Sequence, residues 1–88
     1  MIDDTEDIFD MEAIANELER WWIFTFGSGQ QYEGYFCKVY GTRLGSRDKM
    51  RKKYGNEWAF QYTLDEWGQW LRTKPSWIQE EQFLEKIK

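Results

Sequence analysis

Apolar residues recur at two different spacings along the chain, and the spacing changes from one segment to the next. In Trp22–Phe26 and Trp58–Tyr62 the aromatic residues stand two positions apart, which is the period of a β-strand with one face in a core. Tyr35–Tyr40 alternates in the same way. The first two strands are joined by the polar, glycine-containing segment Gly27–Gly34, so this pattern predicts an antiparallel hairpin followed by a third strand.

Helical spacing marks other segments. Apolar residues three and four positions apart, beginning at Met11, predict an acidic helix over residues 5–20. A second helix is expected over Arg47–Tyr54, with Ser46 as its N-cap and Gly55 just past its end. This second helix has few apolar positions, which is typical of a helix on the surface.

Two capping boxes predict the helices of the C-terminal third. Thr63–Glu66 opens a helix that Pro75 ends, because threonine and glutamate at this spacing satisfy each other's backbone donors. The inward face of that helix holds Trp67, Trp70 and Leu71. Ser76–Gln79 has the same form and predicts a last helix over residues 76–87.

The expected order of elements is therefore α-β-β-α-β-α-α, in one domain that spans residues 1–88. We expect a two-layer α+β fold with a three-stranded antiparallel sheet and its helices on one face. Aromatic residues make up 19% of the chain, and such large side chains allow a small domain to build a dense core. The expected core is Trp22, Phe24, Phe60, Trp67 and Trp70.

Charge is segregated along the sequence, although the net charge is only −4. Before Arg20 every charged residue is acidic. These acids cannot all face inward, because an unpaired buried charge is costly, so they form an exposed negative surface that includes Asp7, Asp10, Glu12 and Glu17. A basic segment follows later in the chain, and it consists of Arg43, Arg47, Lys49, Arg51, Lys52 and Lys53.

The composition offers little for catalysis, metal binding or cofactor binding. The chain has no histidine and a single cysteine, whereas zinc sites are built mostly from these two residue types. Cys37 is expected to be a small buried residue, and a lone cysteine cannot form an internal disulfide. Gly27-Ser28-Gly29 lacks the spacing of a phosphate-binding loop. We therefore expect a protein that is not an enzyme and needs no cofactor.

Several stretches resemble a group of small uncharacterised proteins from phages and prophages of Gram-positive bacteria. The resemblance rests on Trp22-Ile-Phe-Thr-Phe-Gly-Ser-Gly-Gln30 and on Tyr54-Gly-Asn-Glu-Trp-Ala-Phe-Gln-Tyr62, and it covers about residues 21–70. It implies a ββαβα core, to which the helices at residues 5–20 and 76–87 are additions. It also implies an origin in mobile elements, whose small accessory proteins include inhibitors of host defences such as anti-CRISPR proteins.

The leading hypothesis is a non-enzymatic protein-binding module that inhibits a host defence nuclease, such as a CRISPR effector, by occupying one of its surfaces. Its partner is then a host or phage protein, in particular a basic one that processes nucleic acid. The candidate binding residues are the four acids named above and the tip of the hairpin loop, Gln30, Gln31, Tyr32 and Glu33. The alternative is a small nucleic-acid-binding protein that uses the Arg43–Lys53 basic segment.

The expected location is the cytoplasm of the host cell. No apolar run reaches the ~18 residues that a membrane-spanning helix needs. The N-terminus lacks the features of a secretory signal, and no disulfide framework points to an oxidising compartment.

Overall fold

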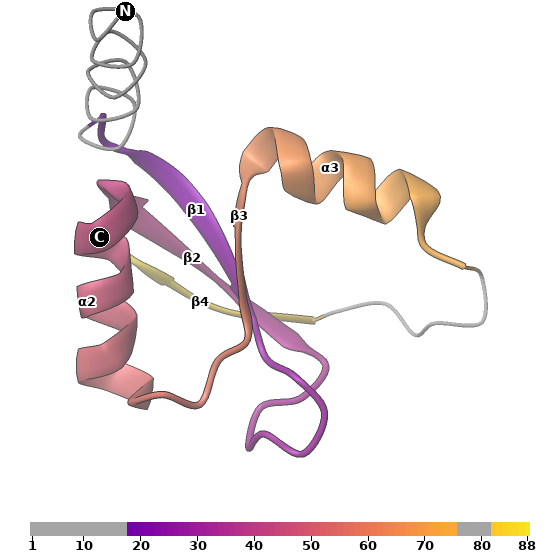
Figure 1. Cartoon of the computed structure of the whole chain (residues 1–88), viewed down its shortest axis with the longest axis horizontal. Helices are drawn as coiled ribbons and strands as arrows, with labels where there is room; N and C mark the ends of the chain where they lie inside the picture. The colour runs from indigo at the N-terminus through magenta and orange to yellow at the C-terminus, as the bar shows by residue number, and fades with distance from the viewer. Residues whose placement is uncertain (1–17, 76–81) are drawn as a thin grey trace, which may run out of the picture.

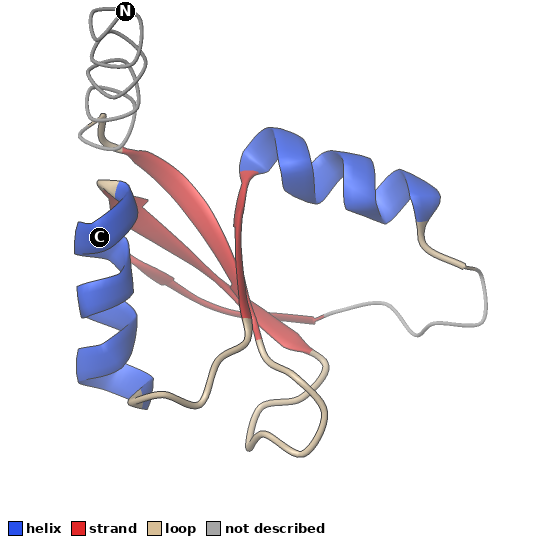
Figure 2. Ribbon diagram, viewed as in Figure 1, coloured by secondary structure: helices blue, strands red, loops and turns tan. Residues whose placement is uncertain are grey.

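The computed structural model describes residues 18–75 and 82–88, which form four strands and two helices (Figures 1 and 2). The elements in chain order are β1 (Arg20–Thr25), β2 (Tyr35–Gly41), α2 (Arg43–Tyr54), β3 (Phe60–Thr63), α3 (Leu64–Thr73) and β4 (Gln82–Ile87). The fold is therefore α+β, as expected. All four strands belong to one sheet.

Strand β1 is one of the two inner strands of this sheet, whose order is β3-β1-β2-β4. It runs antiparallel to both neighbours, with Phe24 opposite Cys37 of β2 and Gln61 of β3. The edge strand β4 runs parallel to β2. A bulge interrupts that pairing at Leu84, because Phe36 lies opposite Phe83 whereas Cys37 lies opposite Glu85. The sheet is thus mixed.

The main core lies between the sheet and α2. Alternate residues of β1 point to this face, and the core cluster consists of Trp22, Phe24, Phe26, Cys37, Val39 and Met50. Met50 of α2 is fully buried. At one border of the core, Phe26 packs edge-on against the rings of Tyr32 and Tyr54. The alternation of β1 was therefore a reliable guide to this face.

The opposite face of the sheet is covered only in part, by α3. Trp67 is 8% exposed and packs against Phe36 of β2 and Tyr62 of β3. The backbone of α3 leaves the sheet beyond this contact (Figure 1). Phe60 of β3 is 59% exposed. The helices therefore flank both faces of the sheet, and the predicted two-layer arrangement with all helices on one face is wrong.

The helix boundaries follow their caps. The capping box of α3 is confirmed, with Thr63 as N-cap and reciprocal hydrogen bonds of 2.8 and 3.1 Å between Thr63 and Glu66. Helix α2 begins at Arg43, earlier than predicted, because Thr42 rather than Ser46 is its N-cap. The Thr42 hydroxyl accepts from the Gly45 N–H at 2.9 Å. Gly55 follows the helix with a φ of 64°, a conformation that suits glycine.

The predicted last helix is wrong over residues 82–87, where the chain forms β4. Phe83, Leu84 and Ile87 fit a helical face, but the same residues also fit a strand that completes the edge of β2. Backbone pairing with β2 outweighs the local pattern, as tertiary context often does for short apolar segments. The sheet therefore has four strands, not three, and it is not wholly antiparallel.

The predicted acidic helix over residues 5–20 lies outside the described residues except at its end. That end is wrong, because residues 18 and 19 are not helical and β1 starts at Arg20.

The core also differs from its prediction at two positions. Trp22, Phe24 and Trp67 are buried as expected, whereas Trp70 is half-buried and Phe60 is exposed. The two-residue spacing predicts Trp58 and Phe60 on the same face of one strand, but β3 starts only at Phe60. Trp58 packs edge-on against Phe24 at 4.9 Å between ring centroids, on the α2 face.

Replacement of the buried tryptophan of α3 tests this assignment. Trp67→Ala is expected to lower the free energy of unfolding by ~3–5 kcal/mol, through lost burial and the cavity left behind. Phe60→Ala is the control and is expected to cost about 1 kcal/mol or less, as exposed substitutions do. Chemical denaturation measures both. Equal effects of the two substitutions would contradict the described packing of α3.

Candidate functional site

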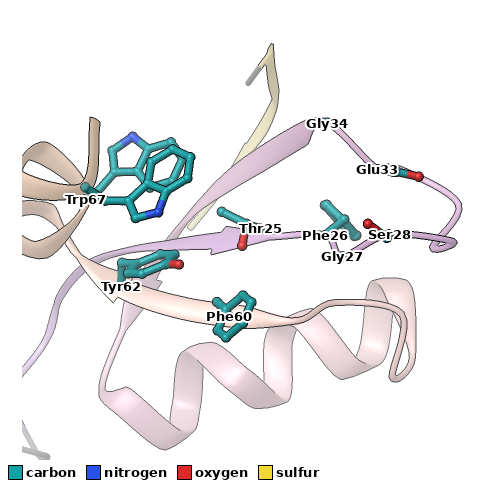
Figure 3. A pocket seen from close by; sticks show the side chains of 10 residues that line it. Thr25, Phe26, Gly27, Ser28, Glu33, Gly34, Phe60, Tyr62 and Trp67 are labelled. Carbon is teal, nitrogen blue, oxygen red and sulfur yellow. The ribbon is translucent and has the colours of Figure 1, made fainter. Parts of the chain in front are cut away.

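An open cleft of about 710 Å³ lies on the sheet face opposite α2, between α3 and the β1–β2 loop (Figure 3). Three parts of the fold supply its walls: the end of β1 with the loop that follows, strand β3, and helix α3. The lining residues are Thr25, Phe26, Gly27, Ser28, Glu33, Gly34, Phe60, Tyr62, Trp67 and Trp70. We refer to this cavity as the aromatic cleft.

The helical wall of the aromatic cleft is a pair of stacked indoles. Trp67 and Trp70 stand one helical turn apart, and their rings are nearly parallel, 8° between planes and 5.4 Å between centroids. The capping box at Thr63 fixes where α3 begins and hence which side chains turn toward the sheet. Neither indole N–H donates to an acceptor within residues 18–75 and 82–88. Within that part of the chain, both donors are open to a ligand.

The strand wall comes from β3, which is an edge strand. Phe60 and Tyr62 point to the same face, two residues apart, with ring centroids separated by 6.1 Å. Figure 3 shows Phe60 and Tyr62 along β3, with Tyr62 beneath Trp67. The cleft thus offers aromatic surface on two adjacent sides.

The third wall is the β1–β2 loop, which is held by its own hydrogen bonds. The Gln30 side chain accepts from the Gly27 N–H, and a Glu33 carboxylate oxygen accepts from the Gly29 N–H at 3.1 Å. The loop also needs glycine, because Gly29 and Gly34 have φ values of 82° and 88°. These contacts give Glu33 and Ser28 a defined place at the end of the cleft remote from the tryptophans (Figure 3).

The four loop residues expected to bind a partner differ in their exposure to solvent. Gln31 and Glu33 are exposed, as predicted. Gln30 and Tyr32 are half-buried, and they support the fold: Gln30 closes the loop onto Gly27, while the Tyr32 ring packs against Phe26 and Tyr54. Of the four, only Glu33 lines the aromatic cleft.

The basic segment Arg43–Lys53 coincides with α2, and much of its charge has a partner within the fold. Lys53 forms an ion pair with Glu85 of β4 at 2.5 Å, and Arg51 pairs with Asp48. Lys49 donates to the carbonyl of Tyr40 at 2.6 Å. The contacts of Lys53 and Lys49 attach α2 to the sheet, whereas the Arg51–Asp48 pair lies within the helix. All three leave fewer cations for a ligand than the sequence alone indicates.

Three arginines of α2 nevertheless follow one another at intervals of one turn. Arg43, Arg47 and Arg51 stand four residues apart, so they lie along one side of the helix. Burial lowers the pKa of Arg47, and the positive charges of Arg43 and Arg51 lower it further. Arg47 donates to the side-chain oxygen of Gln61 at 2.5 Å. We refer to these three residues as the arginine row.

The other residues singled out from the sequence are four N-terminal acids and Cys37. Asp7, Asp10, Glu12 and Glu17 lie outside the described residues. Cys37 is fully buried, as expected. No group of three histidine, cysteine or carboxylate side chains suited to a metal ion occurs within residues 18–75 and 82–88. Neither of the two described helices is long and apolar enough to cross a membrane.

The sequence reasoning missed the aromatic cleft. It assigned Phe60 and Trp70 to the buried core together with Trp67, although Phe60 is exposed and Trp70 is half-buried where they line the cleft. The only signal was the position of the third strand next to a helix with tryptophans one turn apart. Comparison with known proteins adds nothing to this description of the site. The chain matches no protein-family model, no curated protein and no solved structure.

The buried cysteine yields a test of the described packing. Burial and the nearby Glu85 carboxylate raise the pKa of the Cys37 thiol from 9.0 to about 11. At pH 8 the thiolate fraction is then ~0.1%, against ~10% for an ordinary thiol of pKa 9. We expect the native protein to react very slowly with a disulfide reagent, and the denatured protein to react fast. Fast reaction of the native protein would show that β2 is not buried as described.

Proposed function

We propose that the protein is a non-enzymatic binding module that docks onto another protein through the aromatic cleft. The observation that carries this proposal is the exposure of Phe60, on an edge strand, beside two stacked tryptophans. Tryptophan and tyrosine are enriched among the residues that dominate binding energy at protein interfaces. An exposed aromatic surface of this kind is typical of an interaction site.

The surroundings of the cleft support binding more than catalysis. Glu33 is the only carboxylate among the described lining residues, and it stands at the opposite end of the cleft from Trp67. General acid–base chemistry usually needs at least one further group within hydrogen-bond reach of the reacting atoms. A cleft with aromatic walls and a few hydroxyl groups is suited to holding a ligand rather than to transferring its protons.

The biological setting is part of the same proposal. The resemblance of residues 21–70 to small phage and prophage proteins supports an accessory protein of a mobile element that acts in the cytoplasm of a bacterial host. The net charge of −4 favours a basic partner. A host defence nuclease, such as a CRISPR effector, is a basic protein of this kind, and occupation of its surface would inhibit it.

A specific observation favours a second candidate, a nucleic-acid-binding protein. The arginine row has one carboxylate close to it, Asp48, which pairs with Arg51 and leaves Arg43 and Arg47 without an acidic partner in the described part of the chain. Successive arginines on a helix can neutralise successive phosphates. This surface is on α2 and lies on the other face of the sheet from the aromatic cleft.

Affinity capture with matched variants tests the leading proposal. The immobilised wild-type chain is compared with Phe60→Ser and with Leu44→Ser, which changes an equally exposed apolar residue on α2, 62% exposed. We expect a defined bacterial protein to be retained by the wild type and by Leu44→Ser, and to be lost with Phe60→Ser. Retention by all three proteins would remove the aromatic cleft as the docking site.

Charge-matched variants test the alternative. Arg43→Gln with Arg47→Gln removes two cations from the arginine row, and Arg72→Gln with Lys88→Gln removes two from elsewhere. If nucleic acid is the ligand, the first pair is expected to weaken binding at low salt and to reduce the salt dependence by about two charges. The second pair should change little. Absence of any gel shift with DNA or RNA at low salt would eliminate this candidate.

A further inference from the structure

We infer that the aromatic cleft receives a basic side chain of the partner protein, an arginine above all. This inference rests on the proposed function and names what the cleft recognises. It follows from three features of the cleft: the sign of its charge, the nature of its walls, and the occupants that those walls disfavour.

The charge of the lining is negative. Among the described residues that line the cleft, only Glu33 is charged. One of its carboxylate oxygens accepts from the Gly29 N–H at 3.1 Å, and this contact ties the side chain to the loop. The other oxygen accepts no hydrogen bond within the described part of the chain, so it remains available. Guanidinium groups suit such a carboxylate, because they present several N–H donors in a planar fork.

The walls attract cations as well. A guanidinium or ammonium group near the face of an aromatic ring is stabilised by the negative charge density of that face, most strongly by tryptophan. The chain itself makes such pairs repeatedly. Lys74 lies 5.4 Å from the ring centroid of Trp70, Lys86 lies 5.4 Å from that of Trp21, and Arg43 lies 5.7 Å from that of Trp22.

No described lining residue is a cation, although Lys74 already lies beside the Trp70 ring. Phe60 and Tyr62 present adjacent rings on one side, and Trp67 and Trp70 present theirs on the next. Glu33 lies at the other end of the cleft from Trp67 (Figure 3). An arginine whose head group reaches Glu33 can place its apolar stem against rings of the lining, so that the carboxylate binds the charge and the rings cover the stem.

Other occupants fit less well. A phosphate or an acidic side chain would meet Glu33, and none of the described lining residues is a base that would offset the repulsion. A purely apolar side chain would remove water from the carboxylate and give it no partner in return. A cationic residue satisfies the carboxylate and covers the rings.

The test uses the full-length, ¹⁵N-labelled protein and a single-residue probe, Nα-acetyl-arginine N-methylamide. The matched control probe is the citrulline analogue, which has nearly the same shape but no charge. We expect the arginine probe to shift the indole N–H signals of Trp67 and Trp70 and the amide signals of Gly27–Gly34. Binding should be weak, with a dissociation constant of about 1 mM or above for so small a ligand.

The contribution of charge is tested by removing it from the probe and, separately, from the cleft. The citrulline probe is expected to bind at least ~5-fold more weakly, and Glu33→Gln is expected to reduce the affinity for the arginine probe by a similar factor. Glu57→Gln removes an exposed carboxylate that does not line the cleft, and it should leave the affinity unchanged. Both variants change the net charge equally, so the comparison separates a local contact from a general field.

Three results would overturn the inference: equal affinity for the two probes, equal effects of the two carboxylate variants, or no localised shift at the solubility limit of the arginine probe. Failure here is distinguishable from failure of the proposed function. Loss of partner capture in Phe60→Ser without any response to the arginine probe keeps the docking surface and removes the basic side chain. A clear response to the probe with full capture by Phe60→Ser refutes the docking proposal instead.

Discussion

The rest of this structure depends on strand β1, which is paired with a neighbouring strand along both edges and covered by side chains on both faces. Residues 22–26 are all buried, although a strand with one solvent face would bury only alternate side chains. Trp22 and Phe24 hold α2 against one face, and fully buried Ile23 lies on the face that carries α3. The two helices therefore depend on the same six residues of backbone, and through it on each other.

Side-chain hydrogen bonds and ion pairs, in addition to the aromatic core, hold α2 against the sheet. The Gln61 side chain of β3 donates to the Arg43 carbonyl and to the Ser46 hydroxyl, and it accepts from Arg47. Glu85 of β4 joins the other end of the same helix through Lys53 and the Tyr54 hydroxyl. Both edge strands are thereby connected to α2. The aromatic cleft lies on the opposite face, where α3 packs against the sheet through Trp67.

Period and capping were enough to predict the hairpin, the α2 region and the start of α3. The alternation of apolar residues in β1 and β2 and the capping box at Thr63 are local signals, so they can be recognised without knowledge of the rest of the chain. The fourth strand was not predictable in this way, because Phe83, Leu84 and Ile87 satisfy a helical and an extended pattern equally and only β2 decides between them. The aromatic cleft escaped prediction for a related reason: exposure of Phe60 depends on how far α3 extends over the sheet, which no local pattern encodes.

The parallel pairing of β4 with β2 has a consequence for how the molecule folds. Tyr35 meets Gln82 across more than half of the chain's length, whereas β1 and β2 meet through a short loop. Closing the longer loop costs more conformational entropy, and contacts of such high sequence separation form late. Until they form, the edge of β2 has unpaired backbone donors and acceptors, which makes it a template for strands of other molecules. The stage at which this chain is most vulnerable to aggregation therefore precedes the arrival of its final strand.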